Sequence, residues 1–390
     1  RSAVCARSDP LFVHLGEMYK VLPTLALLAF AGHAAAFAPS AGLPVRSRAV
    51  SGMRLTMDME PVIRLGTRGS PLALAQAYET RKRLAAAFPD ELGKEGEGVQ
   101  INIINTSGDM TLDKALSEIG GKGLFTKELD VALLGNEVDF CVHSMKDVPT
   151  FLPDNTHLET MLPREDTRDA FISPKYKTVE ELPEGTIIGS ASLRRQAQLL
   201  AKNPGIKCVN FRGNVQTRLR KLDDDVVDAT LLALAGLKRM DMTDCVTKIL
   251  DWDEMLPAVA QGAIGIQVRS DDEKTIKYIS ALNDKDTKIC VDCERSFLAT
   301  LDGSCKTPIA GQAKLVDGKI HFKGLVASPD GSKIFRAERV GEIEDFMEIG
   351  RSAGEEIRKE AGEQFFADLM EYVQDIQAAN TKPTKQTTAK

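Results

Sequence analysis

The chain has 390 residues, enough for two or three domains, and its 43% hydrophobic and 27% charged residues are typical of a soluble globular protein. A formal net charge of −6 disfavours non-specific binding to nucleic acid, so any anion-binding role must depend on local basic clusters. The seven cysteines are odd in number and scattered, which argues against a disulfide framework and indicates a reducing compartment.

The first sixty residues have the composition of a targeting leader. An apolar run follows Met18 and ends in small residues, which is typical of a signal peptide and is too short for a comfortable membrane span. Residues 40–57 contain Arg and Ser but no acidic residue, as transit peptides do. This order resembles the two-part leader of algae with complex plastids. We therefore expect residues 1–60 to be a leader and the mature protein to lie in the plastid without membrane contact. Simple secretion is the alternative, and the cysteine usage disfavours it.

Strand-like and helix-like segments alternate from Pro61 onward. Ser70 is a good N-cap and Pro71 suits the first helical position. The predicted strands are 62–67, 99–106, 138–144, 185–190, 206–211 and 226–233, and the predicted helices are 71–88, 124–135, 192–202 and 215–222. Strands separated by helices predict parallel sheets with helices on their faces, so we expect two α/β domains. We place the first at 61–163 with 262–281, because the apolar segment 256–269 can return to it, and the second at 167–257.

The pattern changes near Asp284. A predicted helix at 292–301 precedes alternating strands, and the Asp-Gly pairs at 317–318 and 330–331 are hairpin signals. A final helix is predicted at 344–362. We expect a small α+β domain at 284–376, followed by a polar, disordered tail at 377–390.

Two cationic side chains lie at a position where their charge disfavours the predicted secondary structure. Arg194 and Arg195 lie in the first turn of a predicted helix, where positive charge opposes the helix dipole at roughly 0.3–1 kcal/mol each. An anion bound at that helix start would explain them, and an exposed pair reaching into water is the alternative. The pattern recurs at the ends of other strands or in glycine turns, at Arg68, Lys122, Arg212, Arg218 and Arg239. Ligands of α/β sheets bind at such ends, so these cations predict a polyanionic ligand. The lack of a P-loop or a complete GxGxxG favours carboxylates over nucleotides.

Asp147 is a candidate catalytic residue. It directly follows a predicted strand and Lys146, where its carboxylate could stabilise a developing positive charge, although a structural turn is an alternative.

Three of the cysteines lie in sequence contexts that could give them a function. Cys305 lies in the turn-like stretch LDGSCKTPIA, so it is a bystander, a metal ligand, a nucleophile or an attachment point. Cys290 and Cys293 have CxxC spacing but no second pair, so no zinc or redox site is predicted and their role stays open.

Seven blocks of sequence point to one family. They are LGTRGSPLALAQA, GGKGLFTKELD, VHSMKDVP, SLRRQAQL, FRGNVQTRL, LPAVAQGAIGI and ERSFLATLDGSCKTPIAG. From Ile63 to the end of the third predicted domain, the chain resembles the porphobilinogen deaminases, also called hydroxymethylbilane synthases. The most specific motif runs from Glu294 to Pro308.

The resemblance implies an enzyme of haem and chlorophyll biosynthesis. Such an enzyme joins four porphobilinogen molecules head to tail, releases ammonia, and frees the linear tetrapyrrole hydroxymethylbilane by hydrolysis. A dipyrromethane cofactor, made from two porphobilinogen units, is implied on Cys305 through a thioether. The implied fold has three domains, of which the first two are like the lobes of periplasmic binding proteins. The implied enzyme is a monomer and uses no metal.

The resemblance also implies roles for individual residues. Asp147 matches the catalytic aspartate, which stabilises the positive charge that forms as ammonia leaves. The cofactor-binding residues implied are Lys122, Lys146, Ser192, Arg194, Arg195, Arg212 and Arg218. The substrate-binding residues implied are Arg68, Ser70, Arg239 and Gln261, the last in a hinge segment. A two-lobed solute-binding module without catalysis is the alternative, and it gives no role to Asp147 or Cys305.

The attachment of the cofactor is directly testable by intact-protein mass spectrometry. We expect the native protein to carry the added mass of two linked pyrrole units and Cys305→Ala to lack it, because only a thioether at this cysteine would survive denaturation. A native protein of unmodified mass that is active without pyrroles would contradict the attachment.

Overall fold

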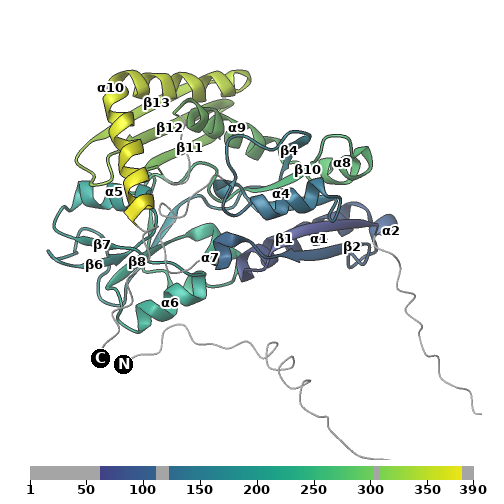
Figure 1. The fold of residues 1–390 in the computed structure, drawn as a ribbon, viewed down its shortest axis with the longest axis horizontal. Helices are drawn as coiled ribbons and strands as arrows, with labels where there is room; N and C mark the ends of the chain where they lie inside the picture. Colours follow the sequence, from purple (N-terminus) through teal and green to yellow (C-terminus); the bar gives the residue numbers. More distant parts are fainter. Residues whose placement is uncertain (1–61, 111–122, 302–306, 380–390) are drawn as a thin grey trace, which may run out of the picture. The chain divides into compact units, whose positions relative to one another are not determined.

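The computed structural model describes residues 62–110, 123–301 and 307–379. Within these residues the chain forms three sheets (Figure 1). The predicted leader and most of the predicted tail lie outside the described residues, as do Lys122 and Cys305. The limits of the three domains stay a prediction.

The first sheet has the strand order β2-β1-β3-β10-β4. Its strands are β1 (Ile63–Arg68), β2 (Val99–Ile104), β3 (Phe140–Ser144), β4 (Thr156–Met161) and β10 (Ile264–Arg269). Its helices are α1 (Pro71–Ala87), α2 (Pro89–Leu92), α3 (Ser107–Met110), α4 (Lys127–Leu134) and α8 (Glu273–Ser280), and the 3₁₀ turn η2 (Met145–Asp147) follows β3. Apolar residues of α1 and α8 pack on one face of the sheet, and those of α4 pack on the other. As predicted, Pro71 starts α1, and the Ser70 side chain accepts a hydrogen bond from the backbone N–H of Ala73.

The second sheet has the strand order β7-β6-β8-β5-β9. Its strands are β5 (Asp169–Ile172), β6 (Ile187–Gly189), β7 (Lys207–Val209), β8 (Ala229–Ala233) and β9 (Lys248–Leu250). Its helices are α5 (Leu193–Lys202), α6 (Val215–Asp223) and α7 (Leu234–Arg239), with a 3₁₀ turn η3 (Thr243–Cys245). Apolar residues of α6 and α7 cover one face and those of α5 the other, so both sheets are sandwiched by helices as α/β domains require.

The expectation of parallel sheets is wrong for part of each sheet. Strand β10 runs antiparallel to β3 and β4, and β5 runs antiparallel to β8 and β9. These strands are reached through two connections between the sheets, which we call the first crossover (162–168) and the second crossover (251–263). A strand that follows a helix packed on its own sheet usually runs parallel to the strand before that helix. Neither crossover is such a helix, so this rule does not apply to β5 and β10, which follow the two crossovers. Strands β4, β5 and β9 were not predicted.

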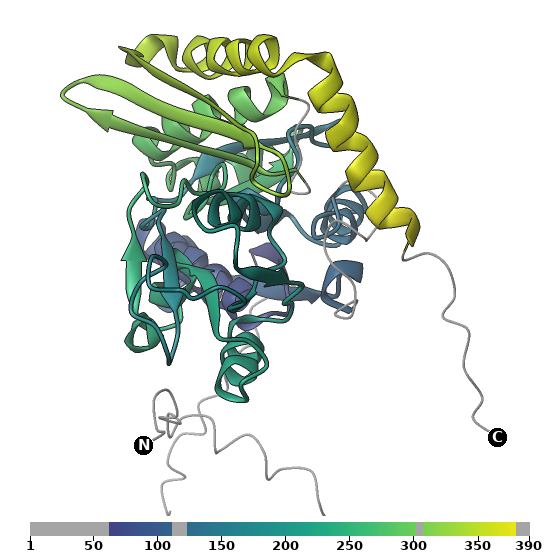
Figure 2. The ribbon, with the colours of Figure 1, turned by 90° about the vertical axis from the view of Figure 1, so that its left-hand side faces the viewer.

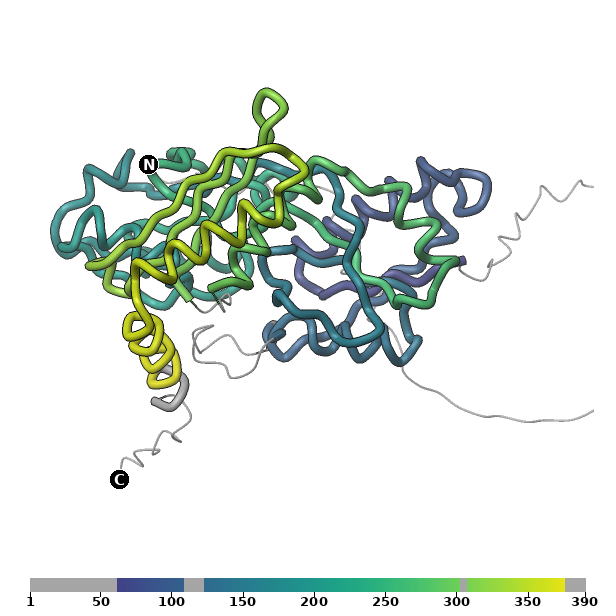
Figure 3. Tube along the Cα trace, turned by 90° about the horizontal axis from the view of Figure 1, so that it is seen from above, coloured from purple at the N-terminus to yellow at the C-terminus, as the bar shows by residue number. Residues whose placement is uncertain are grey.

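The third sheet, β11-β12-β13, is antiparallel. Its elements are β11 (Ile309–Val316), β12 (Lys319–Ala327), β13 (Ile334–Glu342), α9 (Lys285–Thr300), the 3₁₀ turn η4 (Ile343–Asp345) and α10 (Phe346–Ala379). Both predicted hairpins are confirmed, and in the first of them Asp317 and Gly318 have positive φ, as a tight two-residue turn requires. Figure 3 shows α10 beside the strands of this sheet. Figure 2 shows its two halves running in different directions, because Gly362 has φ 77° and ψ 158°.

One carboxylate joins the third sheet to both crossovers. Glu294 of α9 is fully buried and accepts two hydrogen bonds from Arg164 of the first crossover, at 2.7 and 2.9 Å. The same carboxylate accepts from the backbone N–H of Ala260 in the second crossover and of Ala313 in β11. A buried carboxylate with this many charge-assisted bonds fixes the relative places of the segments that donate them.

The core of the third sheet also contains residues of the η2 turn. Met145 and Val148, which flank Lys146 and Asp147, belong to the same buried cluster as Phe297 of α9 and Phe322 of β12. The two residues with predicted chemistry are therefore held between two apolar anchors rather than on a free loop.

Close packing of α10 on α9 yields a stability prediction. A Cβ at Gly350 of α10 would lie 2.0 Å from the carbonyl oxygen of Cys293 in α9, so the two helices cannot keep their separation with a larger residue. We expect Gly350→Ala to lower the free energy of unfolding by about 1–3 kcal/mol, measured by denaturant unfolding. The exposed Lys359→Ala on the same helix is the control and should change it by less than about 0.5 kcal/mol. A Gly350→Ala protein as stable as this control would contradict the packing argument.

Candidate active site

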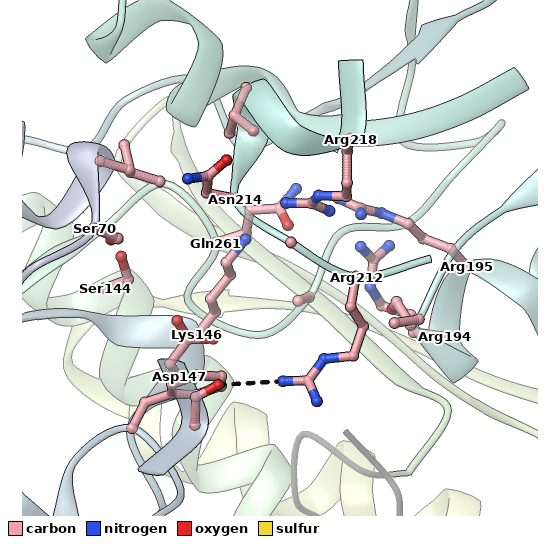
Figure 4. A pocket seen from close by; sticks show the side chains of 18 of the residues that line it. Ser70, Ser144, Lys146, Asp147, Arg194, Arg195, Arg212, Asn214, Arg218 and Gln261 are labelled. Carbon is pink, nitrogen blue, oxygen red and sulfur yellow. Dashed lines mark hydrogen bonds between the residues drawn. The ribbon is translucent and has the colours of Figure 1, made fainter. Parts of the chain in front are cut away.

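Residues around both α/β sheets and the third sheet line one cavity of about 320 Å³ (Figure 4). Among the described residues, its wall contains six cationic side chains and one carboxylate, that of Asp147; the cations are Arg68, Lys146, Arg194, Arg195, Arg212 and Arg218. This excess of positive charge over one carboxylate makes the cavity a site for anions.

Three helices begin at the cavity. The residues that precede α1, α5 and α6 are Ser70, Ser192 and Asn214, and all three line the wall. Asn214 caps α6 by accepting from the backbone N–H of Thr217, whereas the Ser192 side chain makes no capping hydrogen bond. The positive ends of three helix dipoles therefore add to the charge of the side chains.

Asp147 stands at the end of the η2 turn. Its Oδ2 lies 3.8 Å from Nη1 of Arg68, whose guanidinium is 4.0 Å from the ring centre of Phe125. Arg295 of α9 donates to the carbonyl oxygens of Val148 and Pro149, at 3.1 and 2.7 Å. Asp147 is thus positioned from the first sheet and from the helix that leads toward Cys305 in the sequence.

Arg194 and Arg195 share one buried acid, Asp169. Asp169 Oδ2 accepts from Arg194 Nη2 at 2.8 Å and from Arg195 Nε at 3.3 Å, and Oδ1 accepts from Arg195 Nη2 at 2.7 Å. Burial alone would raise the pKa of this carboxyl, but Arg194 and Arg195 lower it far below its usual range. Both guanidiniums are buried, so the exposed-pair alternative is wrong.

Arg218 and Arg194 each keep a buried donor without a partner. Their Nε atoms form no hydrogen bond within the described part of the chain. Burial is the main cause that lowers the pKa of Arg218 from 12.5 to about 10, and the neighbouring cations Arg195 and Arg212 contribute to this shift. Figure 4 shows Arg212 extending toward Asp147. Cations that are buried beside other cations favour an anionic partner, because none of their neighbours neutralises them fully.

The pKa of Lys146 is also strongly lowered. Burial lowers the pKa of its ammonium from 10.5 to about 8; Asp147 opposes this shift and Arg195 adds to it. The structure therefore holds an incompletely compensated charge next to the carboxylate, where an anionic ligand would restore the usual pKa.

Two predicted substrate-binding residues have partners within the protein. The Gln261 amide donates to the Thr167 carbonyl at 2.7 Å and to Asp169 at 2.8 Å, and Gln261 lines the cavity. Arg239 donates to the Gly262 carbonyl at 2.9 Å, lies 3.5 Å from Glu79, and is not among the residues that line the cavity. Its role toward substrate stays a prediction.

The sequence reasoning missed Asp169, Phe125 and Arg295. Only Asp169 carried a usable signal, since an acidic residue opens the otherwise apolar stretch DAFI. A charge at the start of a buried strand needs a buried partner, but the partners lie 25 and 26 positions away on another element.

Family models match most of the described chain. Residues 63–277 match "Porphobilinogen deaminase, dipyromethane cofactor binding domain", and residues 288–359 match "Porphobilinogen deaminase, C-terminal domain". The chain belongs to the porphobilinogen deaminase family. This membership decides against the alternative of a solute-binding module without catalysis.

Similar proteins of the porphobilinogen deaminase family come from plants and bacteria. A chloroplastic porphobilinogen deaminase of Oryza sativa subsp. japonica is 56% identical over 329 residues, covering 84% of this chain and 91% of the relative. That of Pisum sativum is 58% identical over 78% of this chain and 83% of the relative. Porphobilinogen deaminase of Paracoccus denitrificans is 51% identical over 79% of this chain and 97% of the relative.

Among solved structures, a periplasmic substrate-binding protein of an ABC transporter from Coxiella burnetii is 16% identical, with a TM-score of 0.35, covering 58% of this chain and 93% of that chain.

The perturbed lysine predicts how stability depends on pH. In the pyrrole-free Cys305→Ala protein, charged Lys146 opposes folding below pH 8, because its pKa is about 8 when folded and near 10.5 when unfolded. Between these values only the unfolded chain keeps the proton, so the free energy of unfolding should rise with pH. We expect this rise to be smaller in Cys305→Ala with Lys146→Met, measured by denaturant unfolding from pH 7 to 10.

The exposed Lys359→Met, made in the same background, is the matched control and should keep the rise. Parallel curves for the Lys146→Met and control proteins would show that Lys146 is not perturbed.

Proposed function

We propose that the basic cavity is the active site of an enzyme that joins four porphobilinogen molecules head to tail into hydroxymethylbilane, with release of ammonia. The observation that carries the proposal is that six cations and only one carboxylate, Asp147, line the cavity among the residues that the structure describes. Each pyrrole unit brings an acetate and a propionate, so a growing chain accumulates negative charge. Desolvating that charge requires cations that are already fixed in place.

The residues present fit a dipyrromethane cofactor. Its two pyrrole units carry carboxylates, and the buried Nε donors of Arg194 and Arg218 have no partner among the described residues. The residues that would hold it are Lys122, Lys146, Ser192, Arg194, Arg195, Arg212 and Arg218, with Cys305 as the point of attachment. When bound, the cofactor supplies a primer whose terminal pyrrole has a free α-carbon for bond formation. Leu298 and Thr307, which flank Cys305 in the sequence, line the cavity and support this assignment.

The carboxylate of Asp147 would act where positive charge develops. As the C–N bond of the aminomethyl group of porphobilinogen breaks, ammonia leaves and the pyrrole becomes electron-poor. A fixed carboxylate stabilises this charge and can accept hydrogen bonds from pyrrole N–H groups. Arg68, Ser70, Arg239 and Gln261 would bind the substrate, with Arg68 nearest to Asp147.

We assign the enzyme to haem and chlorophyll biosynthesis in the plastid. Support comes from the chloroplastic names of two relatives and from the leader-like composition of residues 1–60. In the described residues no helix is long and apolar enough to span a membrane, and no cluster of three or more His, Cys, Asp or Glu could hold a metal. The monomeric state and the independence from metal remain predictions.

The role of Asp147 is tested by Asp147→Asn, which keeps the shape and removes the charge. We expect the rate of porphobilinogen consumption to fall at least about 100-fold, while intact mass still shows the attached pyrroles, because the arginines that bind them are unchanged. The exposed Asp154→Asn is the matched control and should keep normal turnover. Near-normal turnover in Asp147→Asn would rule out the role proposed for this carboxylate.

A further inference from the structure

We infer that Asp169 is a positioning residue for the reaction, because its buried carboxylate sets the guanidinium groups of Arg194 and Arg195 in the geometry that receives ligand carboxylates. The inference rests on the proposed function of the cavity and adds a residue to it. Asp169 itself is not among the residues that line the cavity, so it would act through the two arginines rather than on the ligand.

The contacts of Asp169 account for both of its oxygens. Oδ2 holds Arg194 and Arg195, and Oδ1 holds Arg195 and the Gln261 amide, at distances between 2.7 and 3.3 Å. The residue is 0% exposed. Four donors are directed at this buried carboxylate, so neither oxygen is left to bind water or a ligand. The carboxylate therefore acts by orienting the groups that donate to it.

Each guanidinium is also held from a second direction. Arg194 Nη1 donates to the Leu256 carbonyl at 2.7 Å, and Arg195 Nη1 donates to the Leu231 carbonyl at 2.9 Å. Two fixed acceptors determine the orientation of a planar guanidinium, so the remaining N–H groups point in set directions. Figure 4 shows the two guanidinium groups close together, beside that of Arg218.

The charges of Asp169, Arg194 and Arg195 also support a positioning role for the acid. Burial lowers the pKa of Arg194, Asp169 raises it, and Arg195 lowers it again, so the two cations would repel each other without the acid. One carboxylate between two guanidiniums removes that repulsion and still leaves one net positive charge. The acid therefore allows two adjacent cations to persist in a buried place without neutralising the site.

Asp169 also ties the pair to both crossovers. It directly follows the first crossover in the chain, and Gln261 belongs to the second. The Gln261 amide bridges Asp169 and the Thr167 carbonyl, while its buried Oε1 has no partner among the described residues. The orientation of the arginines thus depends on segments that connect the two sheets.

Two possible roles of Asp169, cancelling charge and positioning the guanidinium groups, predict opposite effects of Asp169→Asn on the binding of carboxylates. If the acid only cancelled charge, its loss would make the cavity more positive and strengthen the binding of carboxylates. If the acid positions the guanidiniums, its loss leaves an amide whose N–H₂ group opposes their donors, and binding weakens.

We expect purified, folded Asp169→Asn to carry attached pyrroles in a minority of molecules by intact mass. The fraction that is loaded should show a KM for porphobilinogen raised at least about ten-fold, with a smaller change in kcat. The matched control is Asp139→Asn, because Asp139 also pairs with two arginines, Arg64 at 2.7 Å and Arg269 at 3.6 Å, away from the cavity. This control should lose stability but keep full pyrrole mass and an unchanged KM.

A second variant, Asp169→Glu, keeps the charge and moves the carboxylate by one methylene. We expect it to fold and to show reduced pyrrole attachment, which supports positioning even if Asp169→Asn does not fold. Full attachment with a KM within two-fold of the native value in either variant would overturn the inference. Failure of the proposed function is a separate outcome, since the native protein itself would then lack the pyrrole mass.

Discussion

In the described part of the chain, six positively charged side chains are kept around one small, partly buried cavity, and the rest of the structure depends on holding them there. Like charges at close range in a medium of low polarity repel strongly, and each also loses hydration. The protein compensates only in part, through Asp147 and the buried Asp169. The remaining positive charge can attract an anionic ligand. Burial and the neighbouring cations also lower the pKa values of Lys146 and Arg218, because both make the charged form less stable.

The scaffold brings these charges together by simple topological means. Arg68 ends one strand, Lys146 follows another, and α5 and α6 begin just after strands β6 and β7. The carboxyl ends of neighbouring parallel strands meet at one edge of a sheet, and two such edges contribute to the cavity. The apolar anchors of η2 and the backbone bonds from Arg295 then hold Asp147 with little freedom. A site with this much internal charge needs such rigid support, because small displacements would change every pairwise interaction.

Features that depend on nearby residues could be predicted from the sequence, and features that depend on distant partners could not. The Ser70 cap and the Asp-Gly hairpins involve a few consecutive residues whose preferences are strong. The reversal of β10 and β5 depends on how the crossovers run between sheets, which no local pattern encodes. Arg194 and Arg195 could be recognised as out of place at a helix start, but their pairing with Asp169 required the fold. The cationic residues of the cavity could therefore be predicted from the sequence, whereas the buried acid that holds two of them in place could not.

The order of strands in the first sheet has a consequence for biosynthesis on the ribosome. Strand β10 lies between β3 and β4, so β4 has no partner in its own sheet until residues 264–269 have been made. The second sheet needs no strand beyond Leu250 and can be completed earlier in translation. The first sheet is therefore begun before the second sheet but completed after it, and β4 keeps an unpaired edge until β10 has been made.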